Sequence, residues 1–412
     1  MKIILLLAVF CFELFALDIN QAVQLALKNN HQLKKEKYVY EESEANKNVT
    51  RASFLPLINL GYAYNNRDKV IPNVQTKEDS TFTAVISYNL FNGFSDFNFY
   101  KSSKMGVAYN KLTYDATKYD IVLDTQTDYV SFLIAKSELS TKKDALVLFQ
   151  KQYLDAKNQF EQGIIAKNDK LQVEVEMLQA QQDVQDAKSA LKVARLTLGN
   201  AISTNLDGLN VSDKLVFDES KVYNNFDYKS RDEIKALSML MSSYKAYRRA
   251  IQGDYLPKVD VSNTTAKTGT NMSLGNNPIG YPSMQNTTTL QLSWNLFNGG
   301  RDMSNALAYE KKVQQTSEQL EDTKQNIILQ YKSAKYKLKV AKLNLATATL
   351  ALKQAKINYS IMNNKFKEGL IKSTDLIDAN YLLTKAKDSY NKAYYDKYLS
   401  LVTLDRITQQ GL

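Results

Sequence analysis

One six-residue motif occurs twice in this sequence, and the repetition constrains the fold more than any other feature. YNLFNG occupies residues 88–93 and WNLFNG occupies residues 294–299. The surroundings repeat as well: FLPLINLGYAY at 54–64 is matched by YLPKVDVSNTT at 255–265, and NQFEQGIIAKND at 158–169 by NKFKEGLIKSTD at 364–375. The chain is therefore predicted to be an internal duplication of a unit of roughly 200 residues, so a fold proposed for one half must also serve the other.

The N-terminus has the pattern of a secretory signal peptide. Met1 and Lys2 precede IILLLAVFCF, an apolar run of the length that export signals use and shorter than a bilayer-spanning helix. We predict a signal peptide over residues 1–16, with cleavage after Ala16. Lipoprotein processing at Cys11 is the alternative, but Phe10 is too bulky for the position before the modified cysteine. Because Cys11 is the only cysteine, the mature chain is predicted to contain none, which suits an exported bacterial protein.

The composition argues against several classes of function. The net charge is +10, but the lysines are spread among glutamates and aspartates, which is typical of a solvated helix face and does not predict nucleic-acid binding. His31 is the only histidine, so soft ligands for a metal site are nearly absent. The sequence contains no Gly-rich phosphate loop and no Ser-His-Asp set. We therefore predict a protein that is not an enzyme and has no cofactor or metal.

Each unit is predicted to contain a helix, a β-hairpin, a very long helix, a turn and a return helix. The long helix is clearest in the second copy, from about Met303 to Phe366, where apolar residues alternate in steps of four and three. They are Ile327, Tyr331, Ala334, Leu338, Ala341, Leu345, Ala348, Leu352, Ala355, Tyr359, Met362 and Phe366. This spacing, with no Pro or Gly, is typical of a coiled-coil seam.

The first copy keeps the same spacing and then reverses direction. Its long helix has apolar residues at Leu139, Leu146, Phe149, Tyr153, Ala156 and Phe160, and its return helix at Met177, Ala180, Val184, Ala187, Leu191, Ala194 and Leu198. Both long helices are predicted to end at a glycine, Gly163 in the first copy and Gly369 in the second. An ordinary helical bundle is the alternative, but helices this long exceed what a compact domain of this size uses.

The segments before the two NLFNG motifs alternate with a period of two, which predicts β-strands near 55–65, 81–90, 257–266 and 287–297. Phe82, Ala84, Ile86, Tyr88 and Leu90 fall on one face of the second segment, and Leu290, Leu292, Trp294 and Leu296 on one face of the fourth. Alternation over about ten residues with aromatics near the ends fits a transmembrane β-strand, although a soluble sandwich shows it too. NLFNG is then the junction between strand and long helix.

Four membrane strands cannot close a barrel, because known outer-membrane barrels begin at about eight strands and open edges in lipid leave backbone groups unpaired. Several copies of the chain must therefore share one barrel. Three copies would supply twelve strands.

The duplicated layout, the paired Pro and NLFNG hairpins, and the G-[LI]-x-x-x-x-D turns resemble the TolC family of outer-membrane efflux proteins. The resemblance covers essentially the whole mature chain, with repeats at 17–220 and 221–412. It implies a mixed α/β membrane protein: a homotrimer with a shared twelve-stranded barrel continuous with a long α-helical coiled-coil barrel. It further implies a passive export duct in the Gram-negative outer membrane. The implied partners are outer-membrane lipid, a periplasmic adaptor and an inner-membrane transporter of the RND, ABC or MFS type.

Within the two repeats we expect β-hairpins at about 54–90 and 255–297 and tip turns at about 160–169 and 366–375. The resemblance also implies a gate at the two glycines of these tip turns. Asp375 and Asp378 match the aspartates that ring the constriction, Phe366 matches a position often held by a tyrosine latch, and Asn168 and Asp169 match the partners of that latch. Ile371 stands where some relatives have an arginine, so the latch contacts must differ here. The alternative is that the two aspartates only cap a helix.

The same turns are the expected contact with the adaptor, at Gly163, Ile164, Gly369 and Leu370. A glycine followed by an exposed aliphatic residue at a hairpin tip suggests a docking knob, although glycine capping of a helix explains it equally well. A periplasmic coiled-coil protein without a pore is the competing function. It explains the helices and the signal but leaves the four alternating segments without a role.

Overall fold

A computed structural model describes residues 16–72, 75–215, 223, 226–275 and 283–409. The chain divides into two compact units. The sheet unit comprises Glu36–Tyr114 and Asp232–Lys324, and the tip unit comprises the described residues up to Lys35 together with Asp115–Arg231 and Gln325 onward. The predicted signal peptide lies outside the described residues except for Ala16. Among the described residues, no helix is long and apolar enough to cross a membrane.

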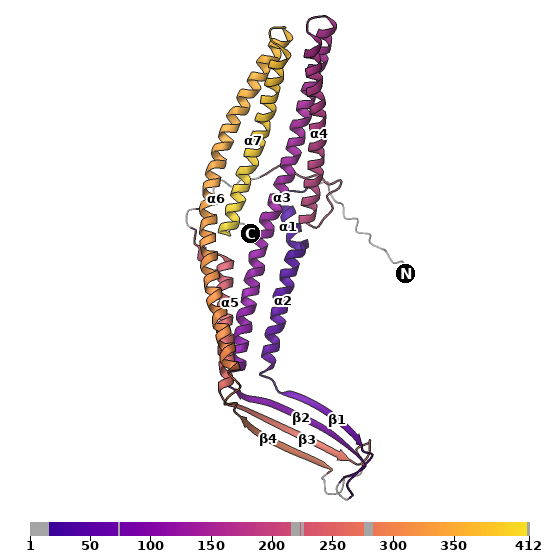
Figure 1. Ribbon diagram of the computed structural model, residues 1–412, viewed down its shortest axis with the longest axis vertical. Coiled ribbons are helices and arrows are strands. Elements are labelled where there is room, and N and C mark those ends of the chain that lie inside the picture. The colour runs from indigo at the N-terminus through magenta and orange to yellow at the C-terminus, as the bar shows by residue number, and fades with distance from the viewer. Residues whose placement is uncertain (1–15, 73–74, 216–222, 224–225, 276–282, 410–412) are drawn as a thin grey trace, which may run out of the picture. The chain divides into compact units, whose positions relative to one another are not determined.

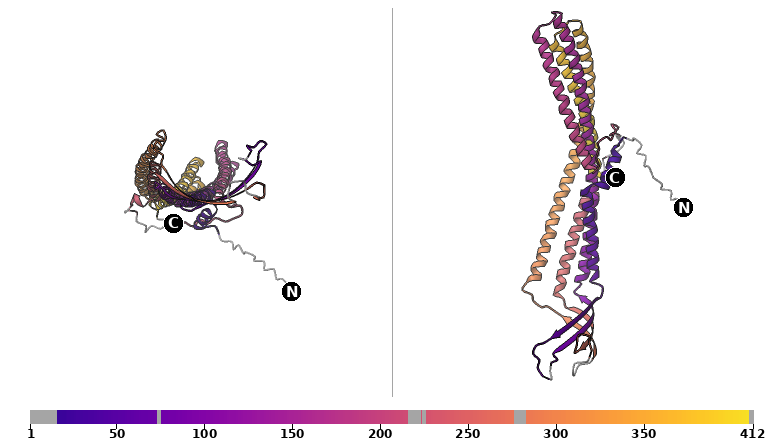
Figure 2. Two further views of the ribbon diagram at one scale, coloured as in Figure 1. Left: turned by 90° about the horizontal axis from the view of Figure 1, so that it is seen from below. Right: turned by 90° about the vertical axis from the view of Figure 1, so that its right-hand side faces the viewer.

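The sheet unit contains a four-stranded antiparallel sheet in the order β1-β2-β3-β4 (Figure 1). The strands are β1 (Leu57–Asn66), β2 (Glu78–Asn92), β3 (Lys258–Gly269) and β4 (Met284–Ser293). In the part of the chain that the structure describes, each pairs only with its neighbours in this order, so β1 and β4 are the two edges. The strands curve together, as Figure 2 shows. All four predicted strands are therefore present, with ends that differ by a few residues.

The register separates an apolar face from a polar face, because residues opposite each other in an antiparallel pair lie on the same side of the sheet. On the apolar face, Ile58 is opposite Ile86 and Val261 is opposite Leu290. On the polar face, Ser87 is opposite Ser262 and Ser262 is opposite Thr289. The predicted alternation is confirmed from Phe82 to Tyr88 and at Leu290 and Leu292. It is wrong beyond them, because the register shifts at Leu90 and because Trp294 and Leu296 lie past the end of β4.

Two polar contacts join neighbouring strands of the sheet. On the polar face, Asn89 Nδ2 donates to Asp260 Oδ1 at 2.8 Å. β3 places polar residues on the apolar face at Asn263, Thr265 and Lys267, opposite Ile86, Ala84 and Phe82. Asn263 Nδ2 donates to Thr288 Oγ1 at 2.9 Å, which joins β3 to β4.

The helices show the duplication most directly. The two long helices, α3 (Ser95–Glu161) and α6 (Arg301–Lys367), both contain 67 residues, which corresponds to about 100 Å at 1.5 Å per residue. The return helices are α4 (Lys167–Ala201) and α7 (Ser373–Thr408), and the helices that precede the hairpins are α2 (His31–Ala52) and α5 (Asp232–Gln252). In the tip unit, α3 pairs with α4 and α6 pairs with α7, and both hairpins turn at the same end (Figure 1).

The predicted seam of α6 is confirmed residue by residue, because all twelve of its apolar positions are buried or half-buried in the single chain. The return helix α4 behaves in the same way at all seven predicted positions. In α3 the prediction holds from Leu139 to Ala156 and fails at Phe160, which is exposed close to the turn.

The single leading helix predicted for the first copy is wrong, because α1 (Ile19–Asn29) and α2 are separate helices. Asn30 causes the break. Its backbone is extended, and its side-chain oxygen accepts from the backbone N–H of Gln32 at 2.9 Å and of Leu33 at 3.1 Å, so it caps the start of α2. Asp18 and Gln21 form a capping box at the start of α1.

Aromatic and charged contacts fix the middle of the tip unit. Tyr129 on α3 is fully buried, and its hydroxyl lies 2.9 Å from the carbonyl oxygen of Leu17 and 2.8 Å from that of Ser212. On the other hairpin, Arg406 Nε lies 2.6 Å from Asp120 Oδ1, which joins the end of α7 to α3. These contacts connect segments that are far apart in the sequence.

Candidate gate and docking tips

The two hairpins of the tip unit end in turns of the same geometry. Gly163 and Gly369 have φ values of 71° and 72°. The N–H of Gly163 donates to the carbonyl of Phe160 at 2.9 Å, and the N–H of Ile164 donates to that of Gln159 at 2.8 Å. The second turn repeats both bonds, Gly369 to Phe366 at 3.0 Å and Leu370 to Lys365 at 2.9 Å. Both helices therefore end in a Schellman motif, which requires a left-handed residue and so favours glycine.

The residue after each glycine is an exposed aliphatic side chain. Ile164 is 63% exposed and Leu370 is 68% exposed. A large apolar side chain is thus held in solvent at the same position of both tips. Glycine capping accounts for Gly163 and Gly369 but does not require Ile164 or Leu370 to be apolar.

The two carboxylates that the sequence places at a constriction begin α7, and both are exposed. Asp375 Oδ2 accepts from the backbone N–H of Lys372 at 3.2 Å, so Asp375 also caps this helix. Asp378 lies one turn further along and therefore on the same side of the helix.

The remaining predicted gate residues differ in exposure. Asn168 is exposed and Asp169 is half-buried at the start of α4, and Asn168 Nδ2 lies 3.4 Å from Asp169 Oδ1. Phe366 is 4% exposed, so its ring packs inside the hairpin in this structure. The structure gives no hydrogen bond between the 366–378 turn and Asn168 or Asp169.

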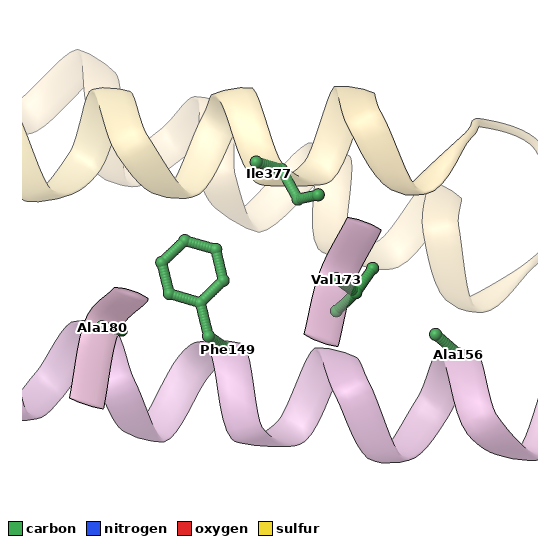
Figure 3. Packing of buried hydrophobic residues seen from close by; sticks show 5 residues of the cluster. All are labelled: Phe149, Ala156, Val173, Ala180 and Ile377. Atoms are coloured by element: carbon green, nitrogen blue, oxygen red, sulfur yellow. The ribbon is translucent and has the colours of Figure 1, made fainter. Parts of the chain in front are cut away.

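One contact near the tips was not predicted: Ile377 of α7 packs against the other hairpin. It forms a cluster with Phe149 and Ala156 of α3 and with Val173 and Ala180 of α4. Figure 3 shows the Ile377 side chain between its own helix and the helix that carries Phe149 and Ala156. Ile377 lies between the two candidate gate carboxylates in sequence, so movement of the gate segment would require this packing to change.

A groove of about 640 Å³ lies beside this cluster, between α7 and the α3–α4 hairpin. Charged side chains of both signs line it: Lys142, Glu176, Asp183, Asp378, Lys385 and Asp388. Lys142 Nζ lies 3.2 Å from Asp183 Oδ2, and Lys387 Nζ of α7 lies 2.9 Å from Asp144 Oδ2 of α3. Ion pairs therefore flank the contact between the hairpins.

Asp388 also lines the groove, and the pKa of its carboxyl group is perturbed. Burial raises its pKa above the ordinary aspartate value, with Glu138 adding to the rise and Lys142 opposing it. A carboxyl group whose pKa is higher in the folded chain than in the unfolded chain favours folding while it is protonated. That contribution is lost as the pH rises through the folded-state pKa.

Asp388→Asn should therefore raise the unfolding midpoint at pH 7 and raise it less at pH 4, because lowering the pH protonates wild-type Asp388 and reduces the cost of its buried charge. Thermal unfolding followed by circular dichroism at both pH values tests this, with the exposed Asp186→Asn as the matched control. Equal midpoint shifts at both pH values would show that the burial of Asp388 has no linked effect on stability.

A second apolar stripe on α6 was also not predicted. Leu329, Tyr336, Leu343, Leu350 and Ile357 recur every seven residues. All five side chains are exposed in the single chain. The heptad spacing was the signal that could have revealed it. An exposed heptad stripe on a long helix is the pattern of a coiled-coil seam whose partner is another chain.

Comparison with known proteins agrees with this geometry. The family model described as "Outer membrane efflux protein" matches residues 22–204 and again residues 229–409, one match to each repeat. No curated protein sequence matches the chain.

Three solved outer-membrane channels share the fold. The Campylobacter jejuni CmeC outer membrane channel has a TM-score of 0.86 at 17% identity, covering 96% of this chain and 86% of that one. The Vibrio cholerae outer membrane protein VceC has a TM-score of 0.83 at 13% identity, covering 95% of each chain. The open state of the Neisseria gonorrhoeae MtrE channel has a TM-score of 0.77 at 14% identity, covering 95% of this chain and 88% of that one.

The family match covers most of the chain in two copies, and the structural likeness extends over both the sheet and the helical hairpins. The chain therefore belongs to the outer membrane efflux protein family.

Proposed function

We propose that three copies of this chain close a twelve-stranded barrel and form the passive export duct of a tripartite efflux or secretion system. The observation that carries this proposal is the two-faced sheet with two unpaired edges. Apolar side chains such as Leu60, Ile86 and Leu292 are exposed on one face, and among the residues that the structure describes neither β1 nor β4 has a second partner strand. In lipid such edges require closure.

The second observation in favour of a ring is the exposed heptad stripe on α6. A helix that is apolar on two sides needs a neighbour for each side, and the stripe is exposed in the single chain while the seam is buried or half-buried. The stripe is then covered by the next copy, so the helical part assembles together with the barrel.

We further propose that Asp375 and Asp378 line the constriction of the duct. Both are exposed at the start of α7, beside the tip turn. In a threefold ring they bring six carboxylates toward one axis, where their summed negative potential attracts cations and favours multivalent ones. The helix-capping bond of Asp375 is compatible with this role, because it uses one carboxylate oxygen.

The adaptor contact is proposed at the tips, where Ile164 and Leu370 are exposed on identical turns. The charged groove between the hairpins gives the same partner a second surface. Opening of the gate then changes the packing of Ile377 against α3 and α4, because that side chain joins the gate segment to the neighbouring hairpin.

Conductance in planar bilayers tests the gate. Asp375→Asn/Asp378→Asn removes both charges while keeping an acceptor oxygen for the N–H of Lys372. We expect the wild-type channel to be cation-selective and blocked by Ca²⁺ or Mg²⁺ added on the tip side, and the double variant to lose the block and most of the selectivity.

The exposed pair Asp186→Asn/Asp396→Asn is the matched control and should behave as wild type. If the gate variant keeps wild-type selectivity and divalent block, the carboxylate ring lies elsewhere and Asp375 is only a helix cap. If no preparation of the chain conducts, the duct itself is rejected and the coiled-coil protein without a pore is favoured.

A further inference from the structure

One segment of α6 accounts for the net positive charge of the chain. Between Asp322 and Glu368 the sequence contains ten lysines and no aspartate, glutamate or arginine. The net charge of the whole chain is also +10, so the remaining residues are balanced in charge. The mixing of opposite charges that describes the rest of the chain therefore does not describe α6.

The first repeat has no such segment. An offset of 206 carries both ends of α3 onto both ends of α6, so the counterpart of residues 323–367 is residues 117–161 of α3. That counterpart contains seven acidic residues and six lysines. The lysines of α6 therefore do not follow from the duplication or from the needs of a long helix, because the same helix of the other repeat is nearly neutral.

Seven of the ten lysines lie in one row along α6, which we call the lysine row. They are Lys332, Lys335, Lys339, Lys342, Lys353, Lys356 and Lys367. Successive positions of the row are three or four residues apart, and all seven lysines are exposed. The remaining positions of the row are Ala346, Thr349, Ser360 and Asn363. The row extends for about 50 Å at 1.5 Å per residue.

The lysine row lies on a side of α6 that neither apolar surface uses. The half-buried seam at Leu345 and the exposed stripe at Leu343 are on roughly opposite sides of the helix, and Lys342 precedes Leu343 by one residue, about 100° around the axis. The side opposite the row is mostly uncharged, as at Asn344 and Thr347. A helix held between two neighbours in a ring has two remaining sides, the exterior and the bore, and the lysine row occupies one of them.

The segment that connects the two repeats indicates which side this is. Tyr223 and Phe226 of that segment belong to one cluster with Tyr331 of α6. The rings of Phe226 and Tyr331 are stacked, with centroids 4.5 Å apart. Lys335 of the row holds its Nζ 5.6 Å from the centroid of the same Tyr331 ring. Because connecting segments run over the outer surface of a fold, the row is placed on the exterior of the helical duct.

The row has no carboxylate partner in the part of the chain that the structure describes. The recorded ion pair of α6 that lies nearest to the row joins Lys324 to Glu321, before the row begins. Like charges three and four residues apart on a helix repel each other. The row therefore costs stability in the isolated chain, and a partner that brings negative charge to it would remove this cost.

We propose that the lysine row binds a carboxylate-bearing polymer of the periplasm, the peptidoglycan, through the free carboxylates of its stem peptides. A lysine is a flexible point charge without the fixed fork of an arginine, which suits carboxylates spread along a polymer. The row contains no large apolar residue, so it lacks the anchor on which protein interfaces are centred. This inference rests on the proposed function only in that the helical duct crosses the periplasm.

Co-sedimentation of the purified trimer with isolated peptidoglycan sacculi tests the inference. Lys335→Gln/Lys342→Gln/Lys356→Gln removes the members of the row that lie farthest around the helix from the apolar stripe, so contacts between copies are disturbed least. We expect the bound fraction to fall by about five-fold or more, and wild-type binding to fall similarly when NaCl is raised from about 0.05 M to 0.5 M. Replacement of the same three lysines by arginine keeps the charge and should preserve binding.

Lys143→Gln/Lys151→Gln/Lys157→Gln is the matched control, because it removes three exposed lysines from α3. It should bind as wild type. Sacculi whose carboxyl groups have been converted to amides should not bind the wild-type trimer. Equal binding by the α6 and α3 variants, equal binding to native and amidated sacculi, or no binding by the wild-type trimer would overturn the inference and leave the proposed function intact.

Two other positions of the row predict different results. If the row contacts carboxylates of the next copy, the α6 glutamine variant should lose the trimer on a native gel while the α3 variant keeps it. If the row faces the bore, the α6 variant should change ion selectivity in planar bilayers without changing sedimentation. Either result would overturn the inference. A wild-type chain that forms no trimer would reject the proposed function itself.

Discussion

Leu292→Arg and Ile86→Arg should each impair membrane insertion by roughly 2–4 kcal/mol if the residue lies near the bilayer midplane. Both side chains are exposed on the apolar face of the sheet, which the register assigns through the pairs Ile58–Ile86 and Val259–Leu292. An arginine there is placed in hydrocarbon, whereas the neighbouring polar face is directed toward the lumen of the barrel. Urea-dependent insertion into lipid vesicles measures the difference directly.

Ser293→Arg is the matched control for Leu292→Arg, because it is the next residue on the same strand and lies on the opposite face. It should insert nearly as well as wild type. If Ser293→Arg and Leu292→Arg are equally damaging, or equally tolerated, the assignment of the lipid-facing side is wrong.

The second large effect is expected on the exposed stripe of α6. Leu343→Asp/Leu350→Asp should abolish the assembled trimer while leaving the single chain folded, because both side chains are about 60% exposed in the chain alone. Each buried leucine contributes about 1.5–3 kcal/mol, and three copies lose two each. A native gel should show monomer, with helical circular dichroism unchanged.

Leu345→Asp separates folding from assembly on the same helix. Leu345 belongs to the half-buried seam, and it lies two residues from Leu343 and therefore on roughly the opposite side of the helix. A carboxylate there is left without a partner inside the chain and should lower the unfolding temperature itself. If Leu345→Asp keeps the wild-type unfolding temperature, or if Leu343→Asp/Leu350→Asp still forms trimers, the half-buried seam and the exposed stripe of α6 have been assigned to the wrong neighbours.

Local periodicity was sufficient to predict most of the fold. The three-four spacing from Ile327 to Phe366 depends only on which side of one helix is apolar, and all of those residues are buried or half-buried. The strands followed from the same kind of evidence. The break at Asn30 was missed because neither Gly nor Pro marks it, although the side chain of Asn30 could have been read as a helix cap.

Contacts between elements could be predicted much less well. Ile377 lies between the two predicted gate aspartates, and nothing in the surrounding sequence, LIDAN at 376–380, indicates that it packs against Phe149 of the other hairpin. The same limit applies to the end of β4 at Ser293, because the apolar alternation of Trp294 and Leu296 predicts that the strand continues and the structure ends it there. The role of Asp375 as a helix cap was recognisable as an alternative, because acidic residues favour the first turn of a helix.

Gel migration of the fractionated protein tests most directly whether the chain is a trimer of the outer membrane. Outer-membrane fractions would be run with and without boiling, and the chain detected by a C-terminal tag. We predict a band of three chains in the unboiled outer-membrane fraction that collapses to a single chain on boiling. A chain found as a monomer in the soluble periplasmic fraction, with the same migration before and after boiling, would contradict the account.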